Sequence, residues 1–212
     1  MVVYTYMQCY VLDTNVFFNM QTGFQLGKTT DEVISAVTQI AKEGKESKEV
    51  ELYMPPRIVE EFLSFFDNPQ QDNIQKMISL ITIKSPDIHQ SMIAAQVFYT
   101  LVQDVRERSL RGLRVGEEEI EEAGKSLMAA GTLPRIEFQK KIGAQIKGFR
   151  ERYRQATRVG FLDSLADLDI IMLAKELNGT VVSSDEGLLK WSRLFGVKEV
   201  SLQSAFRPTH RG

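Results

Sequence analysis

The stretch Cys9-Tyr10-Val11-Leu12-Asp13-Thr14-Asn15 decides the fold and introduces the chemistry. Its apolar residues predict a buried strand over residues 8–13, too uniformly apolar for the edge of a sheet. The strand ends on an aspartate, which a hydroxyl and an amide side chain follow. Taken alone, such an aspartate is most simply a cap for the next turn, so its meaning depends on what the other strands carry at their ends.

The remaining pattern predicts a parallel α/β body. Short apolar runs alternate with segments of helical periodicity, which favours a parallel sheet covered by helices on both faces. Ligands of such sheets gather at the carboxyl ends of the strands. The expected strands cover residues 8–13, 51–54, 81–84, 180–183 and 196–202, and the expected helices cover 31–47 (capped by Thr30 or Asp31), 56–66, a short segment from 74, 164–177 and 186–195.

A helical insertion interrupts this body. Between residues 86 and 160 the sequence shows no strand, and the segment is too long for a simple connection. It predicts three helices, over 88–113, 117–130 and 135–160, with Gly116 breaking the first from the second. The domain division is therefore a body made of residues 1–85 and 161–212 and an insertion made of 86–160.

Three aspartates mark the start of the helix at 164–177. Asp163 suits its N-cap, and Asp167 one turn later suits the positive end of the helix dipole. Asp169 has no such explanation, because it interrupts the apolar face. Asp167 and Asp169 also stand about 200° apart around a regular helix. The side chains of Asp167 and Asp169 therefore cannot both point at one ion unless the first turn of the helix is distorted.

A fifth aspartate, Asp185, follows the apolar strand at 180–183 and precedes Glu186. Its alternative explanation is an N-cap for the next helix. Carboxylates that converge at buried strand ends are costly to desolvate and repel one another, which a divalent cation offsets. An all-oxygen ligand set favours Mg²⁺ or Mn²⁺, and these ions support phosphodiester hydrolysis without a protein nucleophile. No His/Cys cluster suits zinc.

Basic residues concentrate between positions 134 and 160, where eight oppose two acids to give +6 and leave −8 elsewhere. A basic element beside an acidic site suits an enzyme that acts on nucleic acid, although a solvated helix face is the ordinary explanation of such a run. The residues expected to bind nucleic acid are Lys140, Lys141, Lys147, Arg150, Arg152, Arg154 and Arg158.

Composition excludes several other classes. The 212 residues are 43% hydrophobic and 25% charged, as in ordinary globular chains. No apolar run approaches the roughly 18 residues of a membrane span, so no membrane partner is expected, and the start lacks a secretory signal. A single cysteine favours a reducing, cytoplasmic setting.

Three segments together resemble the PIN domain family of nucleases: Val11-Leu-Asp13-Thr-Asn15, Asp167-Leu-Asp169-Ile-Ile-Met-Leu-Ala174 and Val182-Ser-Ser-Asp185. With Asp163 and the helical insertion, the whole chain is similar to the protein-only ribonuclease P family HARP, also labelled RNA ligase partner proteins. The resemblance implies a PIN-like sheet flanked by helices, with an inserted helical subdomain.

What the resemblance implies for function is specific. Members of that family remove the 5′ leader of precursor tRNA with a divalent metal and no RNA subunit, and they assemble through the insertion into large homo-oligomers, described as dodecamers. Carried over residue by residue, the catalytic residues are Asp13, Asp167, Asp169 and Asp185, and the metal-binding set adds Asp163 and Glu186. Two alternatives stay open: another PIN-type endoribonuclease, and a noncatalytic RNA-binding partner of an RNA-processing enzyme.

Overall fold

Five parallel strands in the order β3-β2-β1-β4-β5 make the sheet of this computed structural model, which describes residues 7–18, 26–89, 91–158, 162 and 164–200. Strand β1 lies at the centre, where Val11 pairs with Tyr53 of β2 on one side and Val181 of β4 on the other. The predicted parallel α/β fold is confirmed. The strands are β1 (Gln8–Leu12), β2 (Val50–Met54), β3 (Thr82–Ile83), β4 (Thr180–Val182) and β5 (Lys198–Val200).

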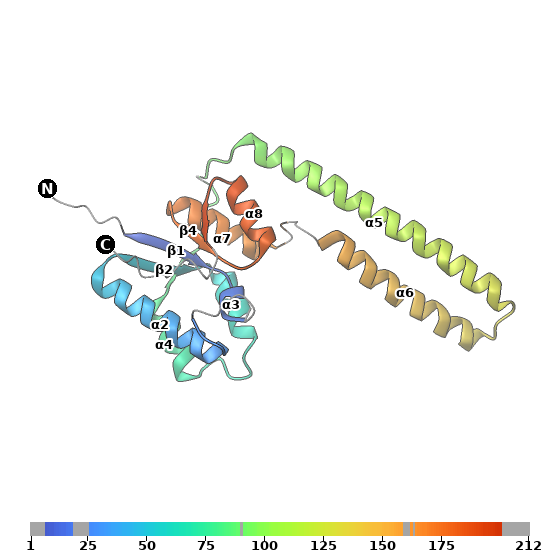
Figure 1. Ribbon diagram of the computed structural model, residues 1–212, viewed down its shortest axis with the longest axis horizontal. Helices are drawn as coiled ribbons and strands as arrows, with labels where there is room; N and C mark the ends of the chain where they lie inside the picture. The colour runs from blue at the N-terminus through green and yellow to red at the C-terminus, as the bar shows by residue number, and fades with distance from the viewer. Residues whose placement is uncertain (1–6, 19–25, 90, 159–161, 163, 201–212) are drawn as a thin grey trace. The chain divides into compact units, whose positions relative to one another are not determined.

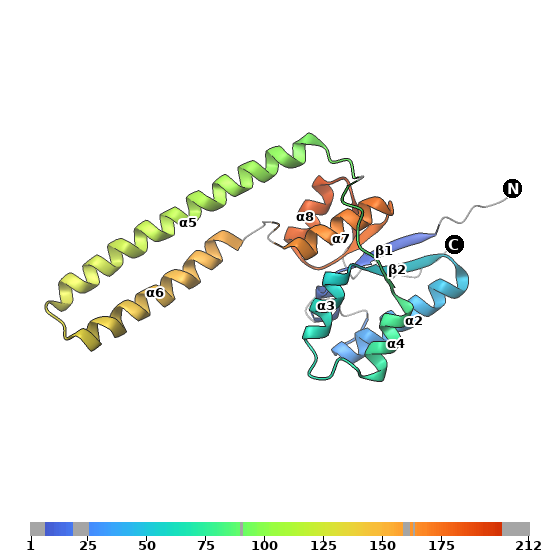
Figure 2. The same ribbon diagram turned by 180° about the vertical axis from the view of Figure 1, so that it is seen from behind.

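Helices cover both faces of this sheet, with α2 and α4 on one face and α7 and α8 on the other (Figures 1 and 2). The two faces follow from right-handed crossovers, because the chain moves one way from β1 to β2 and the opposite way from β4 to β5. The helices of the body are α1 (Asn15–Phe18), α2 (Thr30–Ser47), α3 (Pro56–Ser64), α4 (Asp72–Leu80), α7 (Leu165–Glu176) and α8 (Glu186–Leu194).

Two predicted helix starts are wrong by one residue. Helix α2 is capped by Thr29, whose hydroxyl accepts the Glu32 N–H, and not by Thr30 or Asp31. Helix α7 is capped by Ser164, whose hydroxyl accepts the Ala166 N–H at 3.0 Å. In both cases an uncharged hydroxyl satisfies the free N–H groups of the first turn, which leaves the neighbouring acids available for other contacts.

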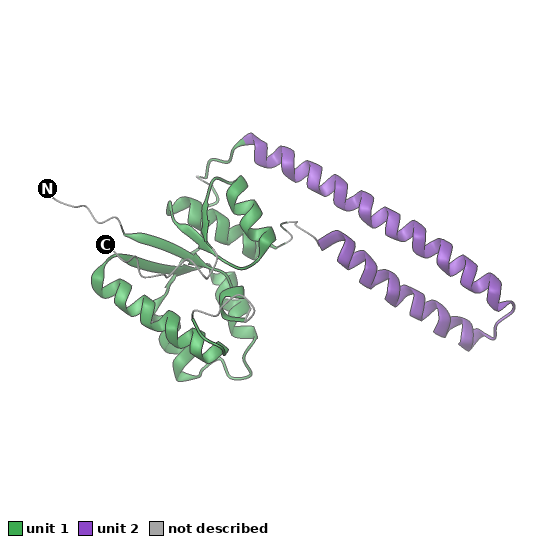
Figure 3. Ribbon diagram, viewed as in Figure 1, with its two compact units in different colours: residues 1–94, 162–212 green, residues 95–161 purple. Residues whose placement is uncertain are grey.

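The chain divides into two units, residues 1–94 with 162–212 and residues 95–161 (Figure 3). The second unit is an antiparallel hairpin of α5 (Ala95–Ala130) and α6 (Arg135–Arg158). Among the described residues, no helix is long and apolar enough to cross a membrane.

Helix α5 runs without interruption through Gly116, so the predicted break is wrong, and residues 88–94 precede the helix instead of forming its start. Glycine costs about 1 kcal/mol in a helix. Close packing against α6 explains Gly112, where a Cβ would lie 2.6 Å from the ring of Tyr153, whereas a Cβ on Gly116 would meet the ring of Phe149 only at 4.0 Å, an ordinary contact distance.

Candidate active site

The order in which strands are added to the sheet reverses between β1 and β4, and acidic residues follow both of these strands. These neighbouring strands send their connections to opposite faces, which makes their carboxyl ends the topological switch point where α/β proteins bind ligands. Asp13 directly follows β1, and Ser183 to Asp185 follow β4. The Asp13 N–H still donates to the carbonyl of Val182 at 3.1 Å, which ties the two strand ends together.

Asp13 is a buried carboxylate, with only 4% of its surface exposed. Burial raises its pKa, hydrogen bonds from Ser183 and Asn15 act in the opposite direction, and the nearby charge of Asp185 raises it further. The Ser183 hydroxyl donates to Asp13 Oδ2 at 2.5 Å. Burial at the centre of the sheet therefore opposes the charged form of Asp13, a perturbation of the kind that often marks functional sites.

Ser183 connects two acidic residues, and sequence reasoning missed it. Its hydroxyl group is fully buried, donates to Asp13 and accepts the Asp185 N–H at 2.9 Å. One side chain therefore fixes both the Asp13 carboxylate and the turn that carries Asp185. The detectable signal was a small hydroxyl residue at the end of a buried strand, two positions before an acid.

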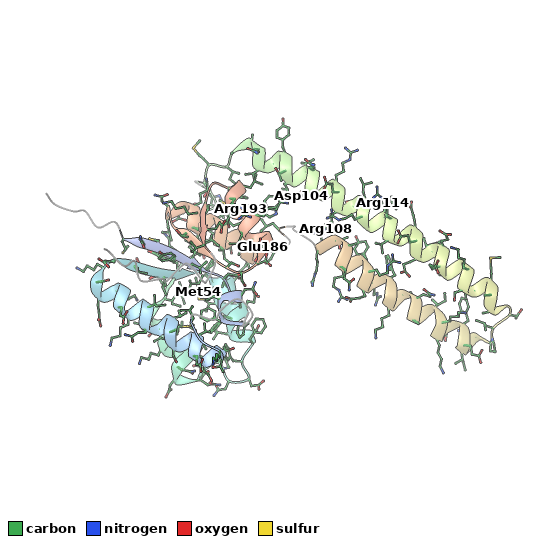
Figure 4. All side chains as sticks on the ribbon, viewed as in Figure 1. Met54, Asp104, Arg108, Arg114, Glu186 and Arg193 are labelled. Carbon is green, nitrogen blue, oxygen red and sulfur yellow. The ribbon has the colours of Figure 1, made fainter. Side chains whose placement is uncertain are left out.

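Asp185 combines a structural and a candidate functional role. Its Oδ1 accepts the Leu188 N–H at 2.8 Å, which makes it the N-cap of α8, as the alternative explanation predicted. The residue is exposed at the switch point, and Glu186 beside it is exposed as well. Figure 4 labels Glu186 at the start of α8 and Met54 at the end of β2, two points on the same edge of the sheet.

Helix α7 contributes two acids with different surroundings. Asp169 pairs with Arg57 of α3, whose Nη1 lies 2.5 Å from its Oδ2. Asp167 is half-buried in the first turn. Asp163 lies outside the described residues. The sequence alone does not single out Arg57, because a basic residue after two prolines is typical of an ordinary helix surface. Glu60 and Glu61, one turn later in α3, are exposed.

The donor chemistry at this edge fits a hard divalent cation. Asp13 and Asp185 supply carboxylate oxygens whose mutual repulsion a cation would offset. The buried Thr14 Oγ1 has no hydrogen-bond partner among the described residues. Within that same part of the chain no three His, Cys, Asp or Glu side chains form a group able to hold a metal.

Seven of the eight basic residues of α6, all except Arg135, fall into two sets. Lys141 donates to the carbonyl of Ser126 at 2.7 Å, and Arg152 pairs with Glu118 and with Glu119, so both contact α5. The second set is exposed and lies within an arc of about 80°, over about 27 Å of helix. Its members are Lys140, Lys147, Arg150, Arg154 and Arg158, here called the basic stripe.

Residues 9–209 match the PINc domain ribonuclease family, as the sheet and its acidic edge lead one to expect. The chain is therefore a PIN-domain endoribonuclease. It is 38% identical over 196 residues to the RNA-free ribonuclease P of Hyperthermus butylicus, covering 90% of this chain and 82% of that one. With the Thermococcus kodakarensis protein of the same name the identity is 35% over 204 residues, covering 96% and 94%. The chain belongs to the RNA-free ribonuclease P family.

Ser183→Ala should slow RNA cleavage by about 10- to 100-fold, because Asp13 and the Asp185 turn lose their common partner. RNA affinity should change less than about twofold, and Ser183→Thr, which keeps the hydroxyl, should recover most of the rate. Single-turnover cleavage and filter binding measure the two quantities.

The matched control is Ser192→Ala in α8, which removes an equally buried hydroxyl whose hydrogen bond goes to the Leu188 carbonyl and not to an acid. Equal loss of cleavage in both alanine variants would assign the effect to general destabilisation.

Proposed function

We propose that this protein removes the 5′ leader of precursor tRNA by metal-dependent hydrolysis that leaves a 5′-phosphate on the tRNA. The main structural support is the hydrogen-bonded arrangement of Asp13, Ser183 and Asp185 at the switch point. It occurs in a chain whose relatives named RNA-free ribonuclease P match about nine-tenths of its length. Fold and relatives favour this substrate over that of another PIN-type endoribonuclease.

The proposed cofactor is Mg²⁺ or Mn²⁺, held by Asp13 and Asp185, with Asp167, Glu186 and Asp163 as further candidate ligands. When bound, such an ion lowers the pKa of a water molecule and stabilises the leaving 3′ oxygen. The chain's own part is to keep the carboxylates in place. Ser183 fixes Asp13, and the cap to Leu188 fixes Asp185 Oδ1. A buried carboxylate needs no rearrangement to accept a cation, which favours catalysis over scaffolding.

The basic stripe is the proposed contact for the tRNA backbone. Structured RNA is recognised mainly through phosphates and shape, and a line of exposed Lys and Arg residues matches that requirement. Lys141 and Arg152 serve the hairpin instead, since their charged groups already bind α5.

Self-assembly is the proposed second role of the hairpin. An apolar hollow of about 260 Å³ lies between α5 and α6, with Ile120, Ile142, Ile146 and Phe149 in its walls. Ile120 keeps 75% of its surface exposed. Exposed aliphatic side chains around a hollow are typical of a protein interface, and a second copy of this chain is the proposed occupant.

The function is tested with a precursor tRNA labelled at its 5′ end. Purified protein with Mg²⁺ should make one cut at the leader boundary, and a chelator should abolish it. Asp13→Asn or Asp185→Asn should lower kcat by about 100-fold or more with RNA affinity nearly unchanged. Asp72→Asn, an exposed first-turn aspartate of α4, serves as the control. Scattered cuts would support a different PIN-type ribonuclease, and binding without cutting would reject catalysis.

Reversing three charges of the stripe, as Lys140→Glu, Lys147→Glu and Arg150→Glu together, should weaken tRNA binding by at least about tenfold and reduce its salt slope by about two to three. The control reverses Lys42, Lys45 and Lys76 on α2 and α4, which changes net charge equally. An unaltered slope in the stripe variant would remove α6 as the phosphate contact.

Assembly is tested by light scattering on the variant Ile120→Lys with Ile146→Lys, which places charge at the hollow. The particle mass should fall while circular dichroism shows the helices intact, because exposed positions tolerate lysine. Met128→Lys, an 86% exposed residue outside the hollow's lining, is the control. An unchanged mass would place the subunit contact elsewhere.

A further inference from the structure

An ion pair joins two helices of the body next to the acidic edge. Arg57 Nη1 lies 2.5 Å from Asp169 Oδ2, across 112 residues of sequence. The Asp169 side chain is 14% exposed, whereas that of Arg57 is 54% exposed. A largely buried carboxylate therefore fixes one side of a guanidinium whose remaining surface faces outward.

Topology places this pair at the carboxyl edge of the sheet. Helix α3 begins two residues after β2 ends, so its first turn lies at the carboxyl end of β2, beside that of β1. Helix α7 leads into β4 and so starts at the same edge. Arg57 lies in the first turn of α3, and Asp169 lies directly after the first turn of α7. Both therefore lie on the side of the sheet that carries Asp13 and Asp185.

Most of the charged side chains described at the carboxyl edge of the sheet are acidic, which gives Arg57 a distinct charge there. The first three residues of α3, α7 and α8 are all described, and Arg57 is the one basic residue among them, against Asp167 and Glu186. A phosphodiester that approaches this edge meets repulsion from every acid. A guanidinium has five N–H donors in a planar fork that matches phosphate, and Asp169 occupies only one side of it.

We infer that Arg57 binds an RNA backbone phosphate beside the cleaved bond and that Asp169 is the positioning residue that orients its guanidinium. This inference rests on the proposed function. It also resolves the geometry of α7, because Asp167 and Asp169 point in different directions from a regular helix. In this assignment Asp167 faces the ion, and Asp169 acts through the arginine.

The experiment compares Arg57→Gln, Arg57→Lys, Asp169→Asn and the Arg57→Gln/Asp169→Asn double variant. RNA binding is measured with Ca²⁺ in place of Mg²⁺, using leader-bearing precursor and mature tRNA, and cleavage is measured over a Mg²⁺ titration. Arg57→Gln should weaken precursor binding about tenfold, lower the salt slope by about one and leave the Mg²⁺ concentration at half-maximal rate unchanged. Arg57→Lys should retain part of the affinity, since it keeps the charge and loses the fork.

Asp169→Asn should reproduce the Arg57→Gln loss, and the double variant should be no worse than either single one. The matched control is Arg193→Gln, which breaks the 2.6 Å pair with Glu199 in the last turn of α8 and should leave binding and cleavage intact.

Three results would overturn the inference. These are an unchanged precursor affinity and salt slope in Arg57→Gln, additive losses in the double variant, or a raised Mg²⁺ requirement in Asp169→Asn, which would make Asp169 an ion ligand. If circular dichroism shows that Arg57→Gln does not fold, the inference is judged instead by the precursor affinity and the salt slope of Arg57→Lys. Failure of the proposed function is distinguishable, because the unaltered protein would then bind RNA without cutting at the leader boundary.

Discussion

The arrangement of the candidate active site depends on one carboxylate that is buried in the middle of a parallel sheet. Asp13 is nearly inaccessible, and its ionised form opposes folding unless hydrogen bonds and a counter-charge compensate it. Ser183 supplies the first compensation from the neighbouring strand. The proposed cation would supply the second, which would couple metal binding to the stability of the strand ends.

Two other aspartates near this edge are also held by partners within the protein. Asp185 gives one oxygen to the cap of α8, and Asp169 gives one to Arg57. Asp13, Asp169 and Asp185 therefore each have an oxygen held by a hydrogen bond or an ion pair before any RNA arrives, which is the condition for electrostatic preorganisation. In the hairpin, Arg152 is held by two glutamates in a comparable way, so its charge contributes to packing, and the exposed stripe is the part of α6 proposed to contact RNA.

Sequence patterns were sufficient for the body and insufficient for contacts between distant segments. Alternating apolar runs predicted the strands, and an acid after β1 and after β4 predicted the edge at which Asp13 and Asp185 lie. Ser183 and Arg57 escaped prediction, because a serine and an arginine gain meaning only from partners 170 and 112 residues away. Local propensity predicts a helix break at Gly116, but α5 continues through it, because propensity does not include the packing of α5 against α6. Asp163 lies outside the described residues, so its place at the edge stays a prediction.

The order of segments along the chain has a consequence for synthesis. Asp13 leaves the ribosome early, but Ser183, Asp185 and α7 follow the whole α5–α6 hairpin. A nascent chain therefore carries Asp13 but no other member of the proposed acidic set until the hairpin has emerged and β4 can insert beside β1. The hydrolytic centre is thus completed only after the segment proposed to contact RNA has been synthesised.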